Sequence, residues 1–408
     1  MNKNISVSIK LIICIISFIL FFNVINASET NLNSKRYILY NLNDTKVIDS
    51  KKEHERVSIA SLTKMMSVIV AIENINNLDK KVTITSDMVD HIAWDVMKVG
   101  FKKGEKYTYR DLLYAAILPS AADAVNALAI SISGSEKAFV KLMNDKVKEL
   151  GLEDTKFANV VGLYDKNNYS SAYDVAQILI YSLKNETFKE VFTTKKYKMS
   201  NGKVLKSTLT RYNEKLKADV SFIKGSKTGF IDESGYCLAS IATLSDVDYL
   251  FVSLNAKKSP MHIEDHITEY KYFDKNFGYK EVLSEGEKLF DLETKYAKES
   301  IIEIKSPITI TKYLKNNFKK SDLVYEYDGI KKQTYFTPNN KLGHMRVKYN
   351  GEVLGEFDLY NSTTLHFDLL SYVKEYRYTI FEVMCVILLI IVLICVKIRK
   401  RKSFISWQ

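Results

Sequence analysis

Residues 58–73 read SIASLTKMMSVIVAIE, an apolar stretch in which a serine and a lysine stand three residues apart. Its large apolar side chains recur at helical spacing, which predicts a helix over 58–73. Ser61 and Lys64 then lie on one face near the helix start, where free backbone N–H groups favour developing negative charge. A neighbouring neutral amine can take the proton of a serine hydroxyl, so the pair can serve as base and nucleophile.

The S-x-x-K pattern is a weak signal by itself in a lysine-rich chain. Ser200 and Lys203 repeat it around Asn201-Gly202, and an Asn-Gly pair is typical of a hairpin turn. The interpretation of Ser61 as a functional serine therefore depends on the other motifs of the chain.

Two further strings follow Ser61 in order. Ser120-Ala121-Ala122 lies between a helix predicted over 109–118, which Pro119 ends, and an alanine-rich helix predicted from 121. A serine in such a turn more often caps a helix than reacts. Lys227-Thr228-Gly229 is predicted on a strand and offers a cation, a hydroxyl and a glycine that lets a substrate come close. Each string alone is weak, but their order and spacing are informative.

Length and composition indicate about two globular domains. The chain has 408 residues, of which 46% are apolar and 26% charged. More than half of the formal net charge of +11 lies at the two chain ends, which leaves a mildly basic body. Such a surface gives no nucleic-acid-binding patch, so nucleic acid is excluded as a partner.

Both chain ends carry apolar runs. Lys3 and Lys10 precede an apolar run from Leu11 to Val24, and the small residue Ala27 follows it. This pattern predicts a signal peptide over 1–27, with an uncleaved anchor as the alternative. Residues 378–396 are long enough to cross a bilayer, and the tail over 397–408 is basic. The positive-inside rule puts that tail in the cytoplasm and the body on the outer side of the cell membrane. A surface-lying helix is the alternative, but the run offers no polar face.

The body is predicted to be an α+β domain followed by a small β domain. Strand-like and helical stretches alternate over 28–290, and short strands dominate over 299–365. The clearest of these is an alternating hairpin around Asn350-Gly351. The small domain is interpreted equally well as a spacer or as a binding module. Cys237 is the one cysteine of the body, so it is expected to be a core residue without a disulfide partner.

Together the three strings resemble the serine penicillin-recognising enzymes. Further stretches narrow the resemblance to the D-alanyl-D-alanine carboxypeptidases, the low-molecular-mass penicillin-binding proteins, over about residues 34–280. These stretches are Ile59–Lys64, Leu113–Ala124, Phe157–Leu163 with Tyr169–Asp174, and Lys227–Leu238. The resemblance implies a β-lactamase/transpeptidase-like fold, in which an antiparallel sheet is flanked by helices and joined to a helical subdomain.

The resemblance also implies acyl transfer without a metal or cofactor. Ser61 would attack the bond between the two D-alanines of a peptidoglycan stem peptide. Lys64 would act as general base, kept neutral with the help of the nearby charge of Lys227, and Ser120 would relay a proton to the leaving amine. β-Lactam antibiotics would acylate Ser61 and act as inhibitors.

The remaining site residues implied by the resemblance bind the substrate. Lys227, Thr228 and Gly229 would hold the terminal carboxylate of the peptide. The backbone N–H groups of Ser61 and Phe230 would form the oxyanion hole.

One residue departs from the family pattern. The second motif is usually Ser-x-Asn, and here Ala122 occupies the asparagine position. The loss of one hydrogen bond predicts a slower enzyme, with Asp123 as a partial substitute or as a helix-capping residue. Two rival functions follow: a β-lactamase on the same scaffold, and a non-catalytic wall-binding or β-lactam-sensing protein.

Histidine chemistry gives weaker alternatives. His262 and His266 are four residues apart on a predicted helix, but H-I-E-D-H lacks the glutamate position of the zinc-protease motif. We therefore interpret His262 and His266 as part of a solvated helix face and not as metal ligands. No G-x-S-x-G string supports a Ser-His-Asp triad.

Overall fold

A computed structural model describes residues 30–405, except for 91, 94–95, 211–218 and 336–340. The chain divides into two compact units, Met1–Lys275 and Asn276–Gln408. The predicted signal peptide over 1–27 lies outside the described residues.

A five-stranded antiparallel sheet is the centre of the first unit. Its strand order is β2-β1-β9-β8-β7, so β7, which carries Lys227-Thr228-Gly229, is an edge strand. Neighbouring strands pair antiparallel throughout. The strands are β1 (Arg36–Asn41), β2 (Lys46–Lys51), β7 (Ile223–Ile231), β8 (Gly235–Leu244) and β9 (Val247–Ala256).

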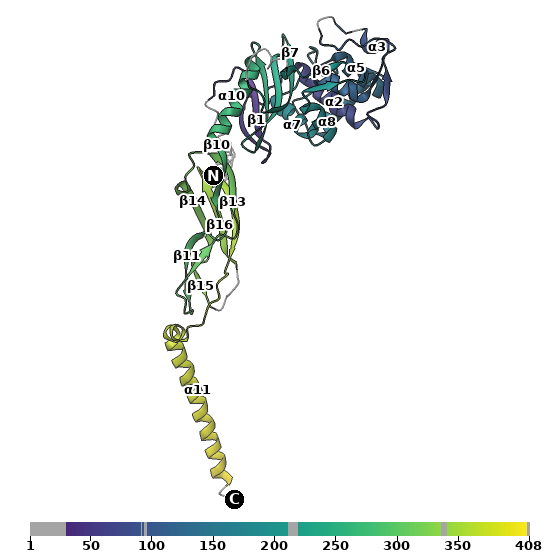
Figure 1. Cartoon of the computed structure of the whole chain (residues 1–408). Helices are drawn as coiled ribbons and strands as arrows, with labels where there is room; N and C mark the ends of the chain where they lie inside the picture. The colour runs from purple at the N-terminus through teal and green to yellow at the C-terminus, as the bar shows by residue number, and fades with distance from the viewer. Residues whose placement is uncertain (1–29, 91, 94–95, 211–218, 336–340, 406–408) are drawn as a thin grey trace, which may run out of the picture. The chain divides into compact units, whose positions relative to one another are not determined.

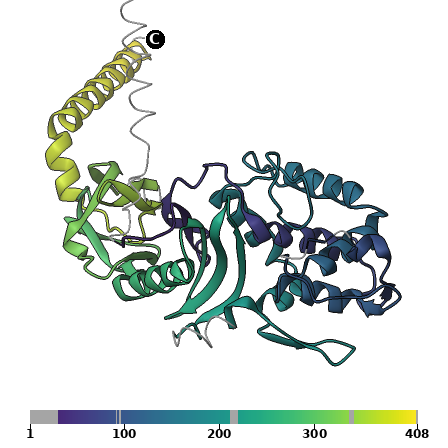
Figure 2. The ribbon, with the colours of Figure 1, turned by 90° about the horizontal axis from the view of Figure 1, so that it is seen from above.

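Helices cover both faces of this sheet (Figures 1 and 2). On one face, α7 (Ala172–Ser182) contacts β1 and β9, and the other helices gather behind it around α2 (Thr63–Glu73). On the opposite face lies α10 (Met261–Asn276), whose His266 contacts Ser240 of β8 and Ser253 of β9. Other helices that lie wholly within the described residues are α3 (Ser86–Val89), α4 (Tyr109–Ile117), α5 (Ala122–Ser133), α6 (Glu136–Glu149) and α8 (Glu186–Thr193). Two short antiparallel pairs are formed by β3 (Lys81–Thr83) with β4 (Lys106–Thr108) and by β5 (Lys196–Lys198) with β6 (Val204–Lys206).

The helix predicted over 58–73 forms, but in two parts. A 3₁₀ turn, η1 (Ala60–Leu62), leads directly into α2. The side chains of α2 from Thr63 to Ile72 are all buried, so this helix lies in the middle of the helical layer. Central burial explains why its sequence is apolar nearly all round.

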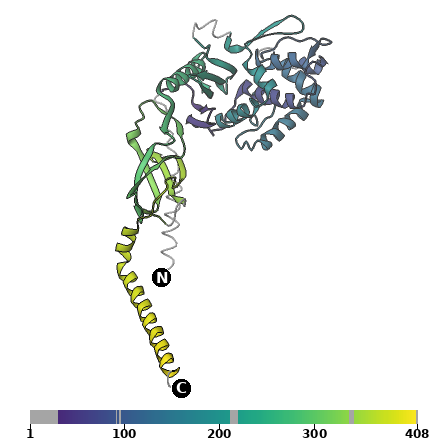
Figure 3. The same ribbon diagram turned by 60° about the horizontal axis from the view of Figure 1, so that its bottom comes forward.

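The second unit consists of short strands followed by one long helix (Figure 3). It begins at Asn276, ahead of the limits of 290 and 299 given above, because β10 pairs with β13 and not with the first unit. The domain limits 28–290 and 299–365 drawn from the sequence remain predictions. The strands are β10 (Phe277–Leu283), β11 (Lys288–Lys295), β12 (Ile301–Lys305), β13 (Ile310–Lys315), β14 (Leu323–Gly329), β15 (Lys332–Thr334), β16 (Lys341–Tyr349) and β17 (Glu352–Tyr360), and a 3₁₀ turn, η2 (Lys320–Asp322), precedes β14.

The long helix is α11 (Leu369–Ile405). Its stretch Leu369–Arg399 is long and apolar enough to cross a membrane, and it includes the predicted span over 378–396. This length and composition are compatible with a membrane anchor.

The solvated helix face predicted for the two histidines of α10 is wrong. His262 is 1% exposed and His266 is fully buried, because α10 packs these side chains against the sheet. His266 bonds two serine hydroxyls of the sheet, Ser240 Oγ at 2.7 Å and Ser253 Oγ at 3.0 Å. Among the described residues no cluster of three His, Cys, Asp or Glu side chains is arranged for a metal ion.

Candidate active site

The first motif brings its two polar groups into contact. Lys64 Nζ lies 2.7 Å from Ser61 Oγ, a hydrogen-bonding distance that permits direct proton transfer. Ser61 stands in the 3₁₀ turn and is partly exposed, whereas Lys64 is buried in the first turn of α2. The amine is therefore shielded from water while the hydroxyl is open to a substrate.

Burial changes the acid–base behaviour of Lys64. Desolvation lowers the pKa of its ammonium group from 10.5 to about 7, because the charged form loses its hydration. The charge of Lys227 was expected to help lower the pKa of Lys64, but burial is the cause found for the lowered pKa. Lys64 Nζ also donates to the Val161 carbonyl at 2.7 Å. A substantial fraction of this amine is thus neutral near pH 7.

Ser120 and Lys227 form a second serine–lysine pair. Ser120 is buried in the turn between α4 and α5, and Lys227 Nζ donates to its Oγ at 2.8 Å and to the Thr228 carbonyl at 2.7 Å. The backbone of Ser120 has φ +65°, a left-handed conformation that a serine adopts at a cost. Such strain at a polar turn is typical of functional sites.

The third motif packs β7 directly against the first motif. A Cβ added at Gly229 would lie 3.0 Å from the Ile59 carbonyl oxygen and 3.1 Å from the Ser61 nitrogen. Only glycine permits this approach without displacing the turn that carries Ser61. Thr228 Oγ1 bonds Thr208 Oγ1 at 2.9 Å, so a second hydroxyl accompanies the motif. Phe230 follows on the same edge strand and is 48% exposed.

The second motif is fixed by Asp123 and not by its Ala122 side chain. The Asp123 carboxylate accepts backbone N–H groups from Val99 (3.1 Å), Gly100 (2.7 Å) and Phe101 (3.1 Å). It is 1% exposed and fully engaged with this loop. Asp123 is therefore an anchor for the loop, and its carboxylate does not replace the missing asparagine amide.

Two contacts at the site were not predicted from the sequence. The Val161 carbonyl and the Thr208 hydroxyl each bond a residue of a predicted motif; Val161 lies in the quoted stretch Phe157–Leu163 but was given no role, and Thr208 lies outside the quoted stretches. A backbone carbonyl leaves no mark in the sequence, and Thr208 lies 20 residues before its partner. Cys237, by contrast, is buried as expected, and burial raises the pKa of its thiol to about 11.

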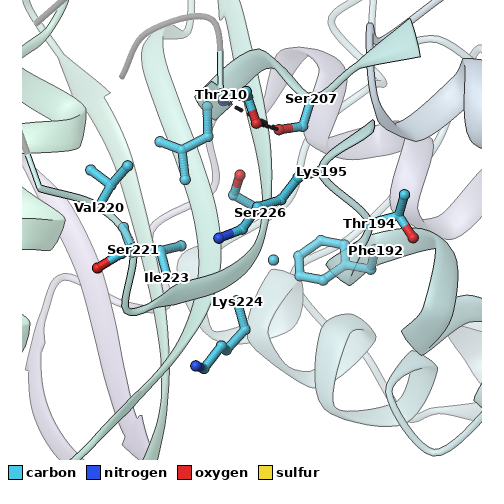
Figure 4. Close-up of a pocket in the computed structure, with 12 residues that line it drawn as sticks. Phe192, Thr194, Lys195, Ser207, Thr210, Val220, Ser221, Ile223, Lys224 and Ser226 are labelled. Carbon is cyan, nitrogen blue, oxygen red and sulfur yellow. Dashed lines mark hydrogen bonds between the residues drawn. The ribbon is translucent and has the colours of Figure 1, made fainter. Parts of the chain in front are cut away.

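A pocket of about 160 Å³ lies beside the start of β7 (Figure 4). Its walls come from the end of α8 and the two residues after it, from residues 207–210, where a helical stretch begins, and from residues 220–226 at the start of β7. None of the predicted site residues lines it, although Ser226 is next to Lys227 in the chain. The pocket is therefore a neighbour of the candidate site and not its catalytic centre.

Comparison with known families agrees with this arrangement. The profile described as D-alanyl-D-alanine carboxypeptidase, peptidase S11, matches residues 23–258. This chain belongs to that family. A second profile, described as the C-terminal domain of penicillin-binding protein 5, matches residues 277–366 and so covers the strands of the second unit. The chain is thus a low-molecular-mass penicillin-binding protein with the two-part organisation of its relatives.

Individual relatives extend over most of the chain. The D-alanyl-D-alanine carboxypeptidase DacF of Bacillus subtilis is 31% identical over 340 residues, which are 81% of this chain and 85% of that protein. The D-alanyl-D-alanine carboxypeptidase of Streptomyces sp. K15 is 34% identical over 206 residues, 48% of this chain and 71% of that protein. The crystal structure of penicillin-binding protein 5 from Haemophilus influenzae matches in fold, with a TM-score of 0.61 and 22% identity over 83% of this chain and 99% of that one.

These findings confirm the fold class and the enzyme class predicted from sequence. The chain is a serine hydrolase of the D-Ala-D-Ala carboxypeptidase type, and the family acts on peptidoglycan peptides and binds β-lactams. The two rival functions, a β-lactamase and a non-catalytic sensor, are not favoured.

Proposed function

We propose that this chain removes the terminal D-alanine from peptidoglycan stem peptides through an acyl-enzyme on Ser61. The observation that carries the proposal is the 2.7 Å contact between Ser61 Oγ and the buried amine of Lys64. A buried lysine with a pKa of about 7 can accept a proton at neutral pH, which an exposed lysine cannot do to any useful extent.

In the acylation step, Ser61 Oγ attacks the carbonyl carbon of the D-Ala–D-Ala bond while Lys64 takes the hydroxyl proton. The backbone N–H groups of Ser61 and Phe230 stabilise the oxyanion, and removal of one such donor costs roughly 10²–10³ in rate. The C–N bond then breaks as the proton held by Lys64 passes through the Ser120 hydroxyl to the leaving amine, so free D-alanine departs and Lys64 is neutral again. Water attacks the remaining ester, with Lys64 again as the base, and Ser61 is regenerated.

Lys227, Thr228 and Gly229 hold the terminal carboxylate of the substrate. The Lys227 ammonium supplies the positive charge, and the Thr228 hydroxyl supplies a hydrogen bond. Gly229 lets the turn that carries Ser61 pack against the strand, beside the carboxylate-binding residues. A β-lactam places its own carboxylate in the same position, acylates Ser61 and deacylates slowly, because its leaving group stays tethered.

We also propose that residues 378–396 anchor the protein in the bacterial cell membrane. The catalytic unit then lies on the outer side, where peptidoglycan is found, and the basic tail lies in the cytoplasm. The proposal is supported by the apolar stretch Leu369–Arg399 and by the basic residues that follow the span.

Two assays on one preparation test the proposed activity. The purified protein is incubated with a fluorescent penicillin and, separately, with a diacyl D-Ala-D-Ala peptide whose released D-alanine is measured. We expect covalent labelling and D-alanine release, and we expect Ser61→Ala to abolish both, while Ser200→Ala, at the exposed serine of the other S-x-x-K string, leaves both intact. Labelling without D-alanine release would support a sensor, and fast hydrolysis of the penicillin would support a β-lactamase.

A further inference from the structure

The segment 157–163 forms neither a helix nor a strand, yet it contacts the amine of Lys64 in the first motif and the hydroxyl of Ser67 further along α2. Its Val161 carbonyl accepts from Lys64 Nζ at 2.7 Å, and its Val160 carbonyl accepts from Ser67 Oγ at 2.6 Å. Lys64 and Ser67 are one turn apart on α2, so two successive carbonyls of the segment lie along that helix.

The same segment contacts the backbone before Ser61. Gly162 has φ +89°, and a Cβ added there would lie 1.9 Å from the Ala60 carbonyl oxygen. Ala60 itself has φ +47°, so two left-handed residues meet at this contact. The position of the segment therefore affects the turn that carries Ser61 as well as the amine of Lys64.

One side chain holds this irregular segment in shape. Asn159 Oδ1 accepts the backbone N–H groups of Val161 (3.3 Å), Gly162 (2.7 Å) and Leu163 (3.1 Å), and its Nδ2 donates to the Leu163 carbonyl at 2.9 Å. An asparagine that bonds the backbone ahead of it in this way replaces the hydrogen bonds that a helix or sheet would provide.

We infer that Asn159 is a positioning residue for the reaction, which holds the Val161 carbonyl and through it the amine of Lys64 beside Ser61. The inference rests on the proposed role of Lys64 as the general base. Asn159 touches neither the substrate nor the reacting atoms, so its effect passes entirely through the segment. Without its amide, three N–H groups lose their acceptor and the Val161 carbonyl is free to move.

The loss of Asn159 has two expected consequences for Lys64. A displacement of about 1 Å in a reacting group costs on the order of 10²-fold in rate, so acylation slows. Water also reaches the amine as the segment loosens, and because burial is the cause of the low pKa of Lys64, that pKa rises. The other charged groups at this place are Lys227 of the facing strand, held by Ser120, and Glu136, which accepts the Val160 N–H at 3.3 Å.

The experiment measures the rate of acylation by a fluorescent penicillin from pH 5.5 to 9.5 in the full chain. We expect Asn159→Ala to lower the rate at pH 7 by 10- to 100-fold and to move the midpoint of the pH profile up by about one pH unit. Asn159→Asp keeps the acceptor oxygens but loses the donor to the Leu163 carbonyl and adds a negative charge near Lys64, so it is expected to lose less rate than Asn159→Ala while its midpoint also moves up. Asn159→Ser, with one hydroxyl acceptor, is expected to lie between the two.

Asn144→Ala is the matched control. Asn144 bonds the Phe157 N–H at 3.0 Å and the Phe157 carbonyl at 2.8 Å, at the far end of the same segment. Its loss is expected to reduce stability without moving the midpoint. An unchanged midpoint in Asn159→Ala and Asn159→Ser, or an equal movement in Asn144→Ala, would overturn the inference; if Asn159→Ala does not fold, Asn159→Ser decides. A wild-type rate that does not depend on pH would refute the role of Lys64 instead.

Discussion

The burial of Lys64 predicts how the acylation rate depends on pH. With a pKa of about 7, half of the amine is neutral at pH 7 and about a tenth at pH 6. A fully exposed lysine with a pKa of about 10.5 would be neutral in only about three molecules in ten thousand at pH 7. Burial therefore increases the concentration of the usable base by about a thousandfold.

The direct perturbation is Lys64→Arg. A guanidinium group fills similar space and can still donate to Ser61 Oγ and the Val161 carbonyl, but it does not lose its proton in proteins. We expect the variant to lose at least about a thousandfold in acylation rate at pH 7, in line with the neutral fraction that burial creates.

The assay is stopped-flow acylation by a fluorescent penicillin between pH 5.5 and 9.5. The wild-type rate is expected to fall about tenfold per pH unit below pH 7 and to level off above pH 8. Lys203→Arg is the control, because Lys203 belongs to the other S-x-x-K string and donates to the Val99 carbonyl at the surface. A flat wild-type profile between pH 6 and 8, or a Lys64→Arg variant that keeps its rate, would refute the reasoning.

Three further predictions concern other parts of the first unit. Gly162→Ala is expected to lower the free energy of unfolding by at least about 2 kcal/mol in urea titrations, because its Cβ would clash with the Ala60 carbonyl; a wild-type stability would contradict the contact. Ala122→Asn restores the asparagine of the family pattern and is expected to raise the D-alanine release rate up to about tenfold, because it adds one hydrogen bond at the site; no gain would contradict the slowing attributed to Ala122. Burial lowers the pKa values of His262 and His266, so the unfolded state binds more protons than the folded state as the pH falls below about 6.5. With a folded-state pKa of about 4, His262 alone is expected to lower the free energy of unfolding by about 2 kcal/mol between pH 7 and pH 5. An unchanged urea midpoint over that range would contradict this expectation.

Much of the fold was predictable because its elements carry strong local patterns. The stretch that became η1 and α2 shows helical spacing throughout, and the strands β8 and β9 are apolar runs between turns. The hairpin of β16 and β17 forms around Asn350-Gly351, where both turn residues have positive φ, as an Asn-Gly turn requires. Such patterns depend on neighbours in the chain, which a sequence displays.

The candidate site was predictable only in part. Ser61 and Lys64 are three residues apart, so their contact follows from helix geometry, and Lys227 was named through a motif. Asn159 was not singled out, because its partners are backbone N–H groups that leave no trace in residue identity. The burial of His266 was missed for a related reason, since its serine partners come from two strands that only the folded sheet brings together.

The most direct test of the account is to identify the residue that a β-lactam modifies. The native protein is treated with a penicillin at pH 7 and digested, and the adduct is located by tandem mass spectrometry. We expect one adduct, on Ser61, in the peptide that contains Ser58 and Lys64. An adduct on Ser120, Ser67 or any other residue, or no adduct in a folded preparation, would contradict it.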